Sequence, residues 1–244
     1  DWLSEYDTIG KVGFIDGLPG SEQHIGRGTF GGAFVITPSI AATDLDDLDI
    51  QAELIAQIKS GALPQPKLDA KGFTNSVYMI DFPPGTAISL QGQKSCAVFQ
   101  AYHGTALLDG TSIPYGVHPE CGYSFSHATV VHSHELVEAI TDPDVALNGA
   151  SVPARPVAWR TPFKNVSESS EEISDLCNNL SFKLDGYSYT KNWSNAAGKC
   201  VGVIPICDGT QAPPACRTCT AFDEGAGCSG TTPVCAIEGE KAGQ

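Results

Sequence analysis

Basic residues are scarce in this sequence. Among its 244 residues, 14 Lys and Arg stand against 28 Asp and Glu, so the formal net charge is −14. Without a basic patch, nucleic acid and anionic membranes are not expected as partners. Long apolar runs are missing too. None approaches the roughly 18 residues that a membrane-spanning helix needs, so membrane insertion is not expected.

Methionine is nearly absent, since Met79 is its only occurrence and the chain begins at Asp1. This start is typical of a mature protein whose signal or pro-segment has been removed. Nine cysteines point to an oxidising compartment. We therefore expect a secreted, extracellular protein, and we expect it to be a monomer.

Six of the nine cysteines lie in the last 45 residues, and from Asp208 onward apolar side chains are too few to form a core. Cys216 and Cys219 have the spacing of a zinc or redox site, but the tail has no histidine, so disulfides are favoured. The pairing stays open, and the odd total leaves one thiol free or bonded to another molecule. We divide the chain into a core domain at 1–206 and a disulfide-stapled tail at 207–244.

Abundant glycine and proline, 26 and 16 residues, favour short strands and turns over long helices. We predict an α+β fold in which a twisted sheet is followed by a helix that Ser126 caps and Pro143 stops. Helices are predicted from Thr43 or Asp44 to Gly61, at about Ser126–Asp142 and at Glu171–Asn178. Strands are predicted at Lys11–Ile15, Thr29–Ile36, Ser76–Phe82, Ala87–Leu90, Ala97–His103 and Ile113–Val117, with a hairpin at Phe182–Trp193.

The helix at 126–142 carries the most informative residues. His134 and Glu138 are four positions apart, so they lie on one helix face and can hold one metal ion. Glu135 lies beside them, where it can take a proton from a water on that metal. The pattern is a variant of the His-Glu-x-x-His zinc-protease helix, with a carboxylate replacing the second histidine. The alternative is an ordinary amphipathic helix whose acidic face is solvated.

A second acidic cluster, Glu-Glu-Ile-Ser-Asp, follows at 171–175. A zinc ion held by His134 and Glu138 needs a third protein ligand, with one position left for water. Glu172 is the preferred third ligand, and Asp175 can accept a hydrogen bond from the free N–H of His134. Taken alone, the cluster is also typical of the acidic start of a helix.

Two stretches, His-Glu-Leu-Val-Glu-Ala-Ile-Thr-Asp at 134–142 and the cluster at 171–175, resemble the zinc-helix motifs of thermolysin-like gluzincins. They depart at Glu138, where those enzymes have histidine. The resemblance implies a zincin-like metalloprotease domain with a Zn²⁺ cofactor, and Ca²⁺ as a possible additional structural ion. The extra carboxylate would also let manganese or calcium compete with zinc. Glu171 and Asp144 are rival third ligands.

Seven patches carry a wider resemblance: Ile25–Gly28, Phe82–Gly85, Ala101–Gly104, Pro114–Val117, Ser133–Leu136, Ala158–Trp159 and Glu172–Cys177. They resemble the secreted EXORDIUM or phosphate-induced family and its bacterial relatives, over about residues 25–177. The resemblance implies an extracellular protein, and the family's Glu-Ile-x-Asp pattern favours Glu172 over Glu171. The cysteine-rich tail is not part of it.

These observations predict a secreted zinc metalloendopeptidase that acts on protein or peptide substrates, with Glu135 as the general base. His103, Tyr115 or His118 could donate a hydrogen bond to the oxyanion. A strand between residues 97 and 117 could pair its edge with an extended peptide. The competing prediction is a non-catalytic extracellular module that binds a structural cation and contacts cell wall or a partner.

Overall fold

The computed structural model describes residues 28–40, 42–147, 159, 172–184, 186–194 and 199–202, with the backbone of two short strands at 216–217 and 234–235. The chain forms two compact units, Gly31–Arg155 and, taken together, Asp1–Phe30 with Pro156–Gln244. Each unit is described by itself. The strand predicted at Lys11–Ile15 and the predicted boundary at 206–207 lie outside the described residues.

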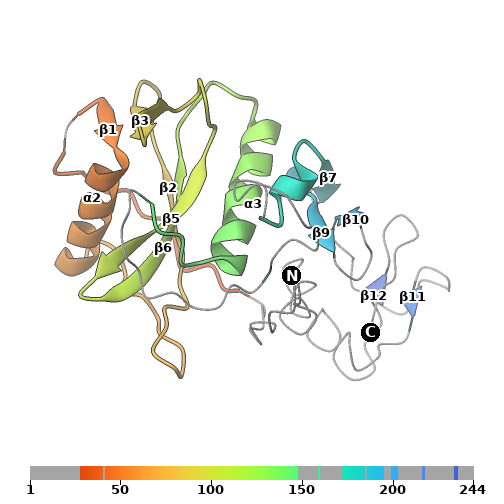
Figure 1. Ribbon diagram of the computed structural model, residues 1–244, viewed down its shortest axis with the longest axis horizontal. Helices are drawn as coiled ribbons and strands as arrows, with labels where there is room; N and C mark the ends of the chain where they lie inside the picture. The colour runs from red at the N-terminus through yellow and green to blue at the C-terminus, as the bar shows by residue number, and fades with distance from the viewer. Residues whose placement is uncertain are drawn as a thin grey trace. The chain divides into compact units, whose positions relative to one another are not determined.

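A three-stranded sheet lies between two helices in the Gly31–Arg155 unit. In the order β2-β6-β5, β2 (Tyr78–Asp81) is parallel to β6 (Thr111–His118), and β5 (Tyr102–Leu108) is antiparallel to β6. The helices α2 (Asp47–Ser60) and α3 (Phe125–Thr141) cover opposite faces of this sheet (Figure 1). The mixed α+β class predicted from the sequence is therefore confirmed.

A second small sheet of the same unit has the order β1-β3-β4. It joins β1 (Asp44–Asp46), β3 (Ala87–Leu90) and β4 (Gln93–Lys94), with β1 parallel to β3. The helix predicted from Thr43 or Asp44 starts only at Asp47, because the preceding residues pair with β3. Asp46 caps this helix in a capping box with Asp49, and Gly61 ends it with φ +80°.

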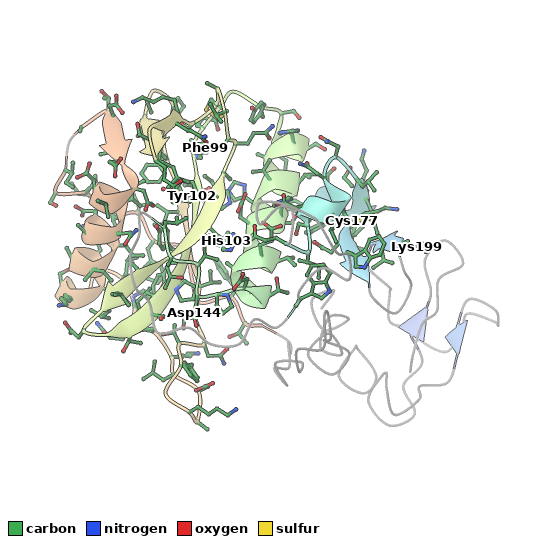
Figure 2. All side chains as sticks on the ribbon, in the orientation of Figure 1. Phe99, Tyr102, His103, Asp144, Cys177 and Lys199 are labelled. Atoms are coloured by element: carbon green, nitrogen blue, oxygen red, sulfur yellow. A yellow bond between two sulfur atoms is a disulfide. The ribbon has the colours of Figure 1, made fainter. Side chains whose placement is uncertain are left out.

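The two faces of the central sheet differ in chemistry, because successive strand residues point to opposite sides. Tyr102 faces α2 and its neighbour His103 faces α3 (Figure 2). The α2 face forms the apolar core: Ile50, Leu54, Ile58, Ile88, Tyr102, Ala106, Ile113, Tyr115 and Val117. By the strand register, the α3 face carries polar residues instead: His103 and Thr105 of β5, His118 of β6 and Asp81 of β2.

The helix α3 lies within one residue of its predicted bounds. Its cap is Ser124, whose hydroxyl accepts from the backbone N–H of His127 at 3.2 Å, and not Ser126 as predicted. At the other end, the backbone N–H of Asp142 donates to Glu138 O. The hydroxyl of Thr105 on β5 donates to the carbonyl of Pro143 at 2.7 Å and so ties the end of α3 to the sheet.

Two predicted strands are wrong or misplaced. Residues 29–36 form no strand. The side chains of Phe30 and Val35 are exposed, so they do not pack this segment against a neighbouring strand. The strand predicted at Ala97–His103 begins only at Tyr102. Cys96 has φ +64° and its N–H bonds to Phe99 O, which closes a turn where the prediction placed a strand.

In the described residues of the other unit, the strands form short antiparallel pairs. The predicted hairpin is present as β7 (Ser181–Leu184) and β8 (Tyr187–Thr190). Two further antiparallel pairs join β9 (Asn192–Ser194) to β10 (Lys199–Val201) and β11 (Cys216–Arg217) to β12 (Val234–Cys235). Of the helix predicted at 171–178, the described residues contain only a 3₁₀ turn, η3 (Asp175–Cys177). The carbonyl of Ile173 accepts from Trp193 N instead of continuing a helix.

Disulfides are present, as the cysteine content predicts. Cys96 bonds to Cys121 in one unit, and Cys177 bonds to Cys200 in the other. Such bonds are typical of proteins from an oxidising compartment. Among the described helices, none has the length and apolarity to cross a membrane.

Candidate metal centre

The acidic face of α3 is buried. Glu135 and Glu138 are only 7% and 2% exposed, and Thr141 is equally buried. Leu136 and Ile140, which the amphipathic interpretation places in the core, are partly exposed. The solvated acidic face considered above is therefore wrong, because the helix turns its carboxylates toward the protein interior.

The sheet supplies an imidazole to these carboxylates. His103, itself buried on β5, places Nδ1 3.5 Å from Glu135 Oε2 and 3.9 Å from Glu138 Oε2. On the helix, His134 Nε2 lies 3.1 Å from the same Glu138 oxygen, as the i,i+4 spacing predicts. Glu138 therefore stands between two imidazoles, one from its own helix and one from β5.

A cation would balance the negative charge of the two buried carboxylates, Glu135 and Glu138. Two carboxylates buried close together repel each other, and the repulsion is relieved by a proton or by a metal ion. The donor atoms of His103, Glu135 and Glu138 all lie within 4.8 Å of one another. Neighbouring donors on a tetrahedral zinc ion are roughly 3.4 Å apart, given Zn–N and Zn–O bonds near 2.1 Å. This buried group could therefore hold a metal ion.

The described part of the Gly31–Arg155 unit contains only some of the other predicted site residues. Glu172 and Asp175 belong to the other unit, and Glu171 lies outside the described residues, so the identity of the third ligand stays a prediction. Asp144 follows α3, and among the described residues it belongs to no group of metal-binding geometry. Tyr115 is on the α2 face, where its hydroxyl donates to Asp47, so it is not beside the acidic face of α3.

A second cluster of ligand-type side chains lies further toward the start of α3. The imidazole of His132 contacts the Asp81 carboxylate and stacks on the ring of His118, with ring centroids 3.8 Å apart. Burial lowers the pKa of His118 to about 3, and nearby His132 adds to this shift, so the His118 ring is neutral. The hydrogen bond to His132 lowers the pKa of Asp81.

Sequence reasoning missed most of this chemistry. From the sequence, His103 and His118 are predicted only as oxyanion donors, and no role is predicted for Asp81 or His132. Their partners lie on α3 or on another strand, far away in the sequence, so no short spacing reveals them. The available signal was strand alternation: His103 and His118 are polar positions within otherwise buried β5 and β6.

No protein-family model, curated protein or solved structure matches this chain. The site therefore has to be interpreted from its own geometry.

Proposed function

We propose that the protein is a secreted, metal-dependent peptidase of the zincin type, with its centre on α3. The observation that carries the proposal is the burial of Glu135 and Glu138 against His103 of β5. Carboxylates turned inward beside imidazole nitrogens suit a divalent cation. An ordinary helix–sheet contact would place apolar side chains at these positions.

The ligand roles follow from the distances and the sequence pattern. His134 and Glu138 would hold the cation, since their donor atoms lie 3.1 Å apart, close to the spacing around a tetrahedral zinc ion. Glu172 is retained as the proposed third ligand on its sequence pattern alone, and Asp175 as the acceptor for the His134 N–H. A bound divalent cation would polarise a peptide carbonyl and acidify a water molecule.

Glu135 would act as the general base. Its carboxylate would accept a proton from the attacking water and return it to the leaving nitrogen. His103 Nδ1, 3.5 Å from Glu135 Oε2, would keep this carboxylate oriented. The strand that carries His103, β5, is the last strand in the order β2-β6-β5. An extended peptide would pair with this edge, beside the base.

One observation favours a second candidate, a non-catalytic cation-binding module. Glu135 lies within ligand distance of both His103 and Glu138, so it could coordinate the ion itself. A carboxylate that coordinates the ion does not serve as the base. The two candidates therefore differ in the role of one residue.

The substitution Glu135→Gln separates the candidates. If Glu135 is the base, zinc content by elemental analysis stays at the wild-type level, and hydrolysis of a general protein substrate falls about 10²–10⁴-fold. If Glu135 is a ligand, zinc affinity falls and the wild-type protein hydrolyses nothing. Glu53→Gln on α2 is the matched control and should change neither property. Full hydrolysis by Glu135→Gln would refute the assigned base.

A further inference from the structure

We infer that α3 carries a second metal site, formed by Asp81, His118 and His132, which takes a divalent first-row transition-metal ion. The three side chains come from β2, β6 and α3, so the fold brings them together from separate parts of the sequence. The site is separate from the proposed peptidase centre, because it uses neither the proposed ligands nor the proposed base of that centre.

The sheet register places two of the ligands side by side. Asp81 on β2 is the register partner of His118 on β6, so both side chains emerge on the α3 face. His132 reaches down from α3, and its ring is almost parallel to that of His118, at 8°. One donor atom from each residue lies within 4.8 Å of the other two. Binding one ion at about 2.1 Å requires the two stacked rings to tilt out of parallel, because an imidazole holds a metal ion in the plane of its own ring.

The orientation of His132 is that of a metal ligand. Its Nδ1 lies 2.7 Å from the carbonyl of Ala128, which can only accept, so Nδ1 carries the hydrogen. Nε2 then faces Asp81. A histidine that donates one ring N–H to a backbone carbonyl presents its other nitrogen in a fixed direction, as histidines bound to metals generally do.

His118 supplies the second, independent observation. Its ring is 4% exposed, and neither nitrogen makes a hydrogen bond of normal geometry, although the backbone of Ile80 lies nearby. Buried polar groups in proteins are nearly always satisfied, and an ion is one of the few explanations for an exception. His118 also lines a pocket with a volume of about 80 Å³, together with Asp81 and His132. One water molecule needs roughly 10–15 Å³ of such space, so a cation together with a water molecule fits there.

The donor set selects the class of ion. Two imidazole nitrogens and one carboxylate oxygen suit zinc and its first-row neighbours, whereas calcium and magnesium prefer oxygen donors alone. The ion is also distinct from one held at Glu138. His132 and Glu138 are six residues apart on α3, a rise of about 9 Å, whereas paired catalytic ions lie roughly 3.5–4 Å apart.

Zinc titration of the metal-free full chain tests the site, by calorimetry together with ¹⁵N NMR of the imidazoles. In the wild type, zinc should shift the His118 and His132 ring nitrogens. Asp81→Asn should lower the zinc affinity of one of the bound equivalents by about tenfold or more. His118→Asn should abolish the binding of that equivalent. His127→Asn is the matched control on the same helix, because its ring bonds to Gln100 outside the cluster.

Asp81→Asn decides the question if His118→Asn fails to fold, since the Asp81 side chain is 69% exposed and tolerates substitution. Zinc binding of equal stoichiometry and affinity in the wild type and Asp81→Asn, with unmoved His132 resonances, would overturn the inference. The cluster would then be a plain ion pair beside a buried histidine.

Discussion

At the residue scale, one buried carboxylate joins α2 to the sheet. Asp47, fully buried at the start of α2, accepts hydrogen bonds from Tyr102 and Tyr115 at 2.7 and 2.6 Å. Burial, together with the charge of Asp47, raises the pKa of both tyrosines above the ordinary value of 10. Both phenols therefore stay protonated at neutral pH and remain donors to Asp47.

We predict that Tyr115→Phe lowers the free energy of unfolding by about 1–2 kcal/mol, because Asp47 then loses one of its donors while it stays buried. Tyr78→Phe is the control. Its hydroxyl donates to the carbonyl of Pro64 at an exposed position, and water can replace it. Urea unfolding of both variants gives the comparison, and equal losses would show that the Asp47 cluster has no special role.

The Asp81–His132 pair predicts a pH dependence in metal-free protein. Burial alone would lower the pKa of His132, but the hydrogen bond and charge of Asp81 and the Ala128 carbonyl raise it above its ordinary value of 6.5. The pair therefore stabilises the fold fully below pH 6.5 and above the ordinary Asp value of 3.8. This stabilisation is lost as the pH rises through the His132 pKa of the folded protein, or falls through that of Asp81.

Titration of the His132 ring by NMR measures this directly. The midpoint should lie above 6.5 in the wild type and fall in Asp81→Asn. Because both side chains are partly exposed, the contribution to stability is small, about 1 kcal/mol or less. A wild-type midpoint below 6.5 would contradict the assigned ion pair.

Contacts between side chains on one helix face could be predicted from the sequence. Contacts between a helix and a strand of the sheet could not. The spacing of His134, Glu135 and Glu138 predicts their common face, and the structure places the His134 and Glu138 donor atoms together. His103 reaches the same carboxylates only through the antiparallel register of β5 and β6. That register depends on pairing between strands, which short sequence patterns do not specify.

At the element scale, both long helices and the strands β2, β3 and β6 lie within a few residues of their predicted bounds, whereas two other predicted strands are wrong or misplaced. Ser, Asp and Gly caps act locally, so both long helices are found within a few residues of their predicted bounds. Strand limits depend on the partner strand. The turn at Cys96 and the unpaired segment at 29–36 both follow from tertiary context, and neither was predicted.

The cap of α3 gives a test at this scale. Ser124→Ala should destabilise the protein by about 1 kcal/mol, because the N–H of His127 loses its side-chain acceptor. Ser126→Ala, one residue inside the helix, should destabilise the protein less than Ser124→Ala does. Thermal unfolding of the two variants compares them, and a larger loss for Ser126→Ala would restore the cap that the sequence alone suggested.

At the scale of the whole molecule, disulfides hold segments that have little regular structure. The bond between Cys96 and Cys121 closes a loop of 25 residues and fixes the segment before α3, where Cys121 lines the pocket of the second cluster. Replacing both cysteines by serine should lower stability by about 3 kcal/mol, since the unfolded chain gains the freedom of an open loop. An unchanged urea midpoint would contradict this role.

The central claim is that α3 buries its acidic face to hold a metal ion. Anomalous diffraction at the zinc edge, from crystals grown with zinc, tests it most directly. The account predicts a peak about 2.0–2.2 Å from the Glu138 carboxylate and within bonding distance of an imidazole nitrogen of His134 or His103. Well-ordered crystals with no anomalous peak near Glu138 would contradict it.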